Sequence, residues 1–272
     1  MFATKQTTIV PDIHGAQDAT GVNLGGVPNL ELESGTTGAP GHIIQQNGSN
    51  FNLQFGRMII PSENFKNSQG DYIGFRSIQK FTSSGTSTWT KPVGVNLIKV
   101  YVTGGGGGGG SHNSDDAQGG GGAGATAIKW IDVRAVSSVD VTVGSGGTGS
   151  VGNTSGGGGT GGTSSFGSYC SATGGIGVAT WGVGGIGGTA TGGDIDLYGS
   201  DGQGGNIDGQ GNEETGGNGG ESFWGGVGHG ASHWGDYTSP RGWGCGGSGS
   251  HASRNNAGTD GMTGAVIIEE YV

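Results

Sequence analysis

The run VNLIKVYVTGGGGGGG at residues 95–110 decides the fold. From Leu97 to Val102, the apolar residues Ile98, Val100 and Val102 alternate with Leu97, Lys99 and Tyr101. A period of two residues is that of a β-strand with two different faces. Seven glycines follow at once. The sequence therefore predicts a strand that leads directly into a glycine segment.

Glycine tracts recur downstream of this run, separated by segments of very different composition. Of the 70 glycines, 57 lie in residues 104–272. The glycine tracts themselves cannot form ordinary helices or strands held by side-chain packing, because glycine costs roughly 0.5–1 kcal/mol relative to alanine inside them. Collagen needs a strict Gly-X-Y period with abundant proline, and Pro240 is the only proline after Pro92.

Extended left-handed helices with three residues per turn are the predicted form of these tracts. Such helices expose their backbone N–H and C=O groups sideways, so neighbouring helices can satisfy one another. A disordered glycine-rich linker is the alternative, and the interspersed aromatic residues and the closing strand argue against it.

Further alternating segments at 127–133, 139–143 and 264–272 predict strands, and no window has helical periodicity. The expected fold is therefore mostly β or irregular, with essentially no α-helix. Residues 1–80 are expected to form a small N-terminal domain. Residues 81–272 are expected to form a β-framed sandwich of packed glycine helices of the polyglycine II form.

Charge and hydropathy exclude several classes of partner. The net charge is −10, and no Lys or Arg lies between Arg134 and Arg241, so nucleic acid is not expected as a partner. No run of about 18 apolar residues predicts membrane insertion, and the amino terminus lacks the apolar core of a signal peptide. Cys170 and Cys245 are most simply free thiols, and whether they pair is left open.

The sequence motifs typical of catalysis, cofactor binding and metal binding match this chain only in part. Gly144–Gly149 matches G-x-G-x-x-G after a strand, but the glycine-rich stretch that follows cannot form the required helix. His229 and His233 have i, i+4 spacing without the glutamate of a zinc helix. The segment 194–208 resembles glycine-aspartate calcium repeats only faintly, because it keeps no nonapeptide period. We therefore expect no enzyme, no cofactor and no metal site.

The segment Glu221–Cys245 is the richest in aromatic residues and holds three of the six tryptophans. Large aromatic side chains set among Gly, Ser and His are typical of binding loops. The alternative is that these rings cover the edges of a glycine core that has few side chains.

Taken together, these features resemble the receptor-binding adhesins at the tip of long tail fibres in T-even-type phages. The resemblance lies in the entry FTSSGTSTWTKPVGVNLIKVYVTGGGGGGG at 81–110, the alternation of glycine tracts with divergent segments, and the ending GAVIIEEY at 264–271. It implies an N-terminal domain seated on the trimeric long tail fibre tip protein, packed polyglycine II helices, and distal loops that contact porins or other host outer-membrane receptors. It also implies a place in the virion, at the fibre tip, after synthesis in the host cytoplasm without a signal peptide.

The candidate recognition loops are 111–118, 164–173, 194–215, 221–243 and 250–260, and we expect their aromatic residues to meet at the end away from the fibre. The candidate receptor-binding residues are His112, Asp115, Tyr169, Tyr198, Phe223, Trp224, His229, His233, Trp234, Tyr237, Arg241, Trp243, Arg254 and Asn255. The candidate fibre-attachment residues are Phe51, Phe55, Met58, Ile59 and Ile60. Two other functions stay open: a tail fibre assembly chaperone, and a polysaccharide-degrading tailspike enzyme, for which the scattered carboxylates offer no catalytic set.

Overall fold

The computed structural model divides into two units, Met1–Ile60 and Pro61–Val272. In the first unit it describes an antiparallel pair of strands, β1 (Glu31–Glu33) and β2 (His42–Ile44). In the second it describes residues 74–112, 117–152, 156–179, 182–206, 215–232, 238–251 and 257–272. These residues include strands and no α-helix, which confirms the predicted fold class.

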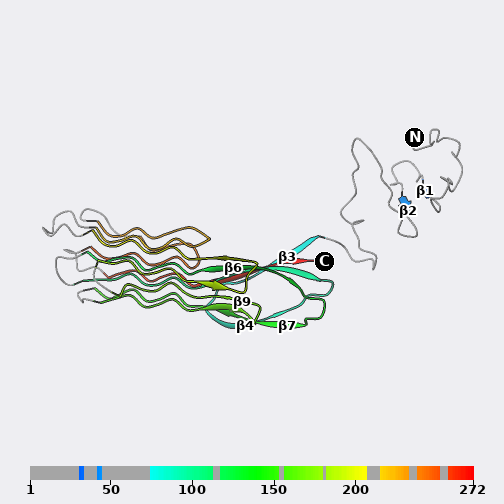
Figure 1. Cartoon of the computed structure of the whole chain (residues 1–272), viewed down its shortest axis with the longest axis horizontal. Coiled ribbons are helices and arrows are strands. Elements are labelled where there is room, and N and C mark those ends of the chain that lie inside the picture. The colour runs from blue at the N-terminus through cyan, green and yellow to red at the C-terminus, as the bar shows by residue number, and fades with distance from the viewer. Residues whose placement is uncertain are drawn as a thin grey trace. The chain divides into compact units, whose positions relative to one another are not determined.

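Two five-stranded antiparallel sheets form one end of the second unit (Figure 1). One sheet has the order β11-β6-β5-β12-β3 and the other has the order β10-β9-β8-β7-β4. The strands are β3 (Phe75–Phe81), β4 (Gly85–Thr90), β5 (Leu97–Thr103), β6 (Thr126–Asp132), β7 (Ser138–Val143), β8 (Ser164–Phe166), β9 (Cys170–Ala172), β10 (Ala190–Thr191), β11 (Ile195–Leu197) and β12 (Ala265–Tyr271).

The hydrophobic core lies between these two sheets. Trp89 of β4 is fully buried and packs edge-on against Phe166 of β8, with ring centroids 5.8 Å apart. The Trp89 Nε1–H group donates a hydrogen bond to the buried Glu270 carboxylate at 3.0 Å. Ser77 and Gln79 donate to the same carboxylate, so this buried charged group has three donors.

Strand β3 lies on the N-terminal side of the boundary that we expected at residue 80. It pairs with β12 from Phe75 to Phe81 and therefore belongs to the glycine-rich unit. The reason is that β12 would otherwise form the edge of its sheet. No clear strand pattern marks this segment, because β3 is an edge strand of mixed polarity.

The glycine tracts continue from the sheets as a lattice of extended chains (Figure 1). In the first tract, 104–111, every third N–H group bonds the same neighbouring tract. Gly104, Gly107 and Gly110 donate to the carbonyls of Ala125, Gly122 and Gly119. The N–H groups of residues 105, 108 and 111 donate in the same way to carbonyls of the tract 156–162. Those of residues 106 and 109 donate to carbonyls of the tract 259–262. This step of three confirms helices with three residues per turn.

The first tract lies at the centre of the lattice. Its N–H groups donate to three tracts, and its carbonyl groups accept from three others, at residues 147–150, 175–178 and 247–250. Six neighbours surround it, and residues 104–112 are buried throughout. The lattice is therefore held by backbone hydrogen bonds, with the tract that follows β5 at its axis.

Candidate functional site at the tip of the glycine lattice

The end of the lattice away from the strands is here called the tip. Consecutive tracts run in opposite directions, so the chain returns to the tip repeatedly. Ser111 pairs with Gly156 there, Asn206 pairs with Thr215, and Gln118 N–H donates to the Ser250 carbonyl at 3.2 Å. Within the described part of the second unit, one tract reaches the tip and the next one leaves it six times. The residues at which this happens are 112 and 117, 152 and 156, 179 and 182, 206 and 215, 232 and 238, and 251 and 257.

Polar side chains replace glycine where the tracts reach the tip. Ser111, Ser150, Gln118 and Ser250 are all buried there, and Ser111 Oγ donates to Ser150 Oγ at 2.9 Å. The Gln118 Nε2 and Ser250 Oγ atoms are buried without a hydrogen-bond partner in the described structure. Such groups are rare in folded proteins.

Some of the predicted receptor-binding residues can be placed relative to the tip. His112 lies at the tip and is 4% exposed. His229 is exposed in the tract 226–232, where its N–H group donates to Thr238 Oγ1 at 3.0 Å. Outside the described residues lie Asp115, His233, Trp234, Tyr237, Arg254 and Asn255, and the predicted attachment residues Phe51, Phe55, Met58, Ile59 and Ile60.

Phe223, Trp224 and Trp243 do lie together, but beside β5 and not at the tip. Trp224 packs edge-on against Trp243 at 5.4 Å and against Phe223 at 5.1 Å, and its Nε1–H group donates to Thr103 Oγ1 at 2.9 Å. The expectation that these rings converge at the distal end is therefore wrong. The cause is the alternation of direction: the chain turns at 222–226 on the strand side, where Gly225 and Gly226 take positive φ.

Three further predicted residues also lie away from the tip. Tyr169 is in the turn between β8 and β9 and packs against the core residue Phe166 at 6.0 Å. Tyr198 directly follows β11 and is 77% exposed. Arg241 is exposed at the strand-side turn, where its N–H group donates to the Gly226 carbonyl at 2.7 Å. Aromatic composition identified surface segments but not the end at which they lie.

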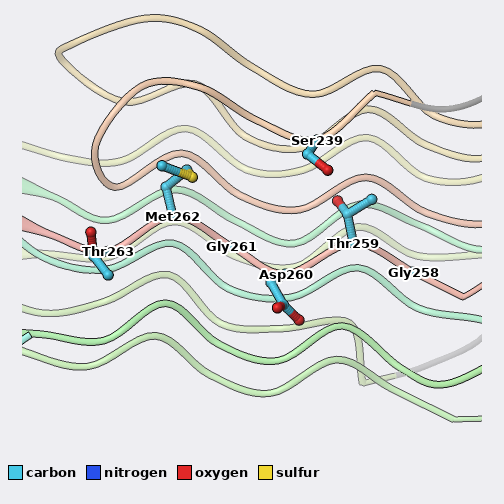
Figure 2. Close-up of a pocket in the computed structure, with 7 residues that line it drawn as sticks. All are labelled: Ser239, Gly258, Thr259, Asp260, Gly261, Met262 and Thr263. Carbon is cyan, nitrogen blue, oxygen red and sulfur yellow. The ribbon is translucent and has the colours of Figure 1, made fainter.

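A groove of about 440 Å³ runs along the last glycine tract, on the side of the lattice (Figure 2). Asp260 Oδ1 there accepts the Gly149 N–H group at 2.7 Å. The N–H groups of Asp260 and Thr263, one turn apart, make no hydrogen bond in the described structure, so this tract is an open edge of the lattice. The groove is lined by Ser239, Gly258, Thr259, Asp260, Gly261, Met262 and Thr263.

The shifted ionisable groups lie in the sheets and not at the tip. Hydrogen bonds from Arg134 lower the pKa of Asp132 to about 2. Burial raises the pKa of the Cys170 thiol to about 11. Cys170 and Cys245 are both free and buried. These shifts have structural causes, namely an exposed ion pair and a core position.

Among the residues that the structure describes, no group of three or more His, Cys, Asp and Glu side chains is placed to hold a metal ion. Over the same residues, no helix has the length and hydropathy needed to cross a bilayer.

The part of the chain that holds the strands and tracts matches the sequence model of a known family. The model of a glycine-rich domain matches residues 82–271, from the end of β3 to the last residue of β12. The chain belongs to this glycine-rich domain family. No curated protein matches the chain. The glycine-rich domain therefore comprises nearly all of both sheets and the whole described lattice.

Sequence reasoning missed the polar residues that end the tracts of the glycine-rich domain. Gln118, Ser150 and Ser250 were not singled out, although each adjoins a glycine tract and is buried at the tip. The available signal was their position at the boundary between a tract and a segment of different composition.

Proposed function

We propose that the protein is an adhesin at the tip of a phage long tail fibre and binds a host outer-membrane receptor through the segments that join the glycine tracts at the tip. The observation that carries this proposal is the return of the chain to one end of the lattice six times in the described part. The resemblance to T-even-type adhesins supplies the rest: the trimeric fibre tip protein as partner, the virion as location, and a porin or another surface component as receptor.

The lattice suits this task because its stability comes from backbone hydrogen bonds between tracts. The segments at the tip can therefore carry side chains selected for binding, while the scaffold that holds their ends stays fixed. Holding a binding segment at both ends lowers the entropy that is lost on binding. Binding of this kind needs no cofactor and no catalytic step.

The aromatic and basic residues in these segments are the best candidates for receptor contact, because Trp, Tyr and Arg dominate interface hot spots. Tyr198 provides a matched aromatic control, since it is 77% exposed at the strand end of the lattice. The residues proposed to contact the receptor are Asp115, His233, Trp234, Tyr237, Arg254 and Asn255. His112, which we also expected to bind the receptor, is buried at the tip and is not among them.

The test is adsorption of full-length variants to host cells. Trp234→Ala and Tyr237→Ala should each weaken adsorption about thirtyfold, the usual loss of roughly 2 kcal/mol for a hot-spot residue, with an unchanged melting temperature. Tyr198→Ala should adsorb normally. If the Tyr198 variant loses adsorption and the other two keep it, recognition does not take place at the tip.

Two further measurements separate this proposal from the other candidate functions. An adhesin stays in the purified virion, whereas an assembly chaperone leaves it. Incubation with host surface polysaccharide should release no fragments, and cleavage would indicate a tailspike enzyme instead.

A further inference from the structure

The sheet β11-β6-β5-β12-β3 has one face turned away from the core, here called the outer face. Its exposed apolar side chains come from β3, β5, β6 and β11. A cluster of this kind on one face of a soluble protein usually marks an interaction site. The side chains, with their exposed fractions, are Phe75 (62%), Ile78 (51%), Leu97 (38%), Trp130 (45%) and Ile195 (54%).

Aromatic contacts connect the middle of the outer face. Tyr271 lies between Phe75 and Trp130, with ring centroids 6.1 and 5.4 Å away. The Lys99 Nζ atom lies over two rings, 5.3 Å from the centroid of Trp130 and 4.9 Å from that of Tyr101. The rings therefore form a continuous surface across β3, β12, β5 and β6.

Hydrogen bonds fix the polar groups of the outer face in place. The hydroxyl groups of Tyr101 and Tyr271 donate to the two oxygens of Glu269, at 3.0 and 2.6 Å. The bond to Glu269 raises the pKa of Tyr271 to about 12, so this hydroxyl keeps its proton at neutral pH. Side chains that are ordered before binding lose little entropy in a complex.

The chain enters the glycine-rich unit at the edge of the outer face. Gly74 exchanges two backbone hydrogen bonds with Val272, at 3.2 and 3.1 Å, directly before Phe75. The candidate attachment residues, 51–60, therefore precede this point of entry in the sequence. The tip lies at the opposite end of the same unit (Figure 1). A receptor at the tip and a carrier at the outer face would not compete for space.

Charge also limits the choice of partner. The chain carries a net charge of −10, yet the outer face presents Lys80 and Lys99, and its one carboxylate in the centre, Glu269, already accepts two hydrogen bonds. A protein surface of apolar side chains with carboxylates opposite the two lysines would fit this face.

We propose that the outer face docks on the tail fibre protein that carries the adhesin, as a contact in addition to the one expected from Phe51, Phe55, Met58, Ile59 and Ile60. This inference rests on the proposed function. The partner surface is apolar and bears acidic groups that meet Lys80 and Lys99.

The experiment is co-purification of the full-length chain with the tail fibre tip protein of the same phage. The double variant Ile78→Lys/Trp130→Lys should reduce the recovered complex at least tenfold. The matched control is Val183→Lys/Ile186→Lys, which introduces the same charges at apolar positions that are 57% and 65% exposed on the lattice. It should co-purify like the parent. Both variants should keep the melting temperature of the parent, because all four side chains are exposed.

A second variant tests the charge complementarity without changing the apolar residues. Lys80→Glu should weaken the complex several-fold, and more strongly at low salt than at high salt. This variant keeps the proposal testable if the double variant does not fold.

The outcomes separate this inference from the proposed function. The inference is overturned if the Lys80 and outer-face variants co-purify normally, or if the parent forms no complex with the fibre protein. It is also overturned if sedimentation shows a dimer of the chain that the outer-face variant disperses while fibre binding is unchanged. Adsorption of the free full-length chain to host cells tests the proposed function alone.

Discussion

Glycine is required in the lattice because neighbouring backbones approach too closely for a Cβ atom, and not because these positions need a positive φ. The glycines with positive φ, such as Gly225, lie at turns and at tract ends, whereas Gly108 in the first tract is not one of them. A Cβ built on Gly108 would instead overlap the carbonyl of Thr148 in a neighbouring tract. The side chain is excluded because the neighbouring backbone occupies its place.

Gly108→Val should therefore destabilise the protein strongly. The surrounding backbones are bonded on all sides and cannot move apart singly, so we expect a loss of about 3 kcal/mol, near the top of the range for overpacking. The corresponding fall in melting temperature is about 10 °C. Thr148→Val is the control, because Thr148 is exposed and already carries a branched side chain. Equal melting temperatures for the two variants in thermal unfolding would contradict the lattice packing.

At the scale of the element, the tract is defined by a hydrogen-bond period of three. The first tract has all its N–H groups from 104 to 111 bonded, whereas the last tract leaves every third group open. In the last tract Gly258, Thr259, Gly261 and Met262 donate to neighbouring carbonyls, and Asp260 and Thr263 do not.

Amide hydrogen exchange should reproduce this period along the last tract. The amides of Gly258 and Gly261 should exchange slowly, near the rate of global opening, and those of Asp260 and Thr263 should exchange quickly. Gly107 and Gly108 in the first tract are the protected reference. Uniform protection from 258 to 263, measured by NMR, would show that another chain covers this edge.

The strands β5, β6, β7 and β12 and the glycine tracts could be predicted from the sequence, but the neighbours of each tract could not. Alternation from Leu97 to Val102 gave β5, and the seven glycines gave the tract after it. Nothing in a run of identical residues tells which of six tracts each N–H group meets. Those partners follow from the path of the whole chain, which also explains why the short strands β8 to β11 were missed.

For the whole molecule, the sequence predicted the scaffold better than the site. Loops between glycine tracts were expected at one end, and the structure has chain connections at both ends. Phe223, Trp224 and Trp243 are on the strand side because of the number of tracts that precede them, which composition does not reveal. His112 is the receptor-binding candidate that the described structure places at the tip.

The two units give a prediction about truncation. Deleting residues 257–272 should abolish soluble folding, because β12 lies between β5 and β3 and buries Val266 and Ile268. Deleting residues 1–60, which form a separate unit, should leave a folded chain. Solubility and thermal unfolding of the two truncations measure this difference. A cooperative transition in the protein that lacks 257–272 would show that the lattice closes without its last tract.

The central place of the first tract has a consequence for synthesis on the ribosome. Residues 104–112 are made before all six of their neighbours, and the last of these neighbours, 257–264, follows about 150 residues later. Loops of up to about 150 residues must close before this tract is enclosed, and chains rich in such distant contacts fold slowly. During translation the backbone N–H and C=O groups of this tract lack their final partners, and water must satisfy them until the neighbouring tracts are made. A domain built around its earliest glycine tract thus completes its lattice only in a late step, after its last tract has been synthesised.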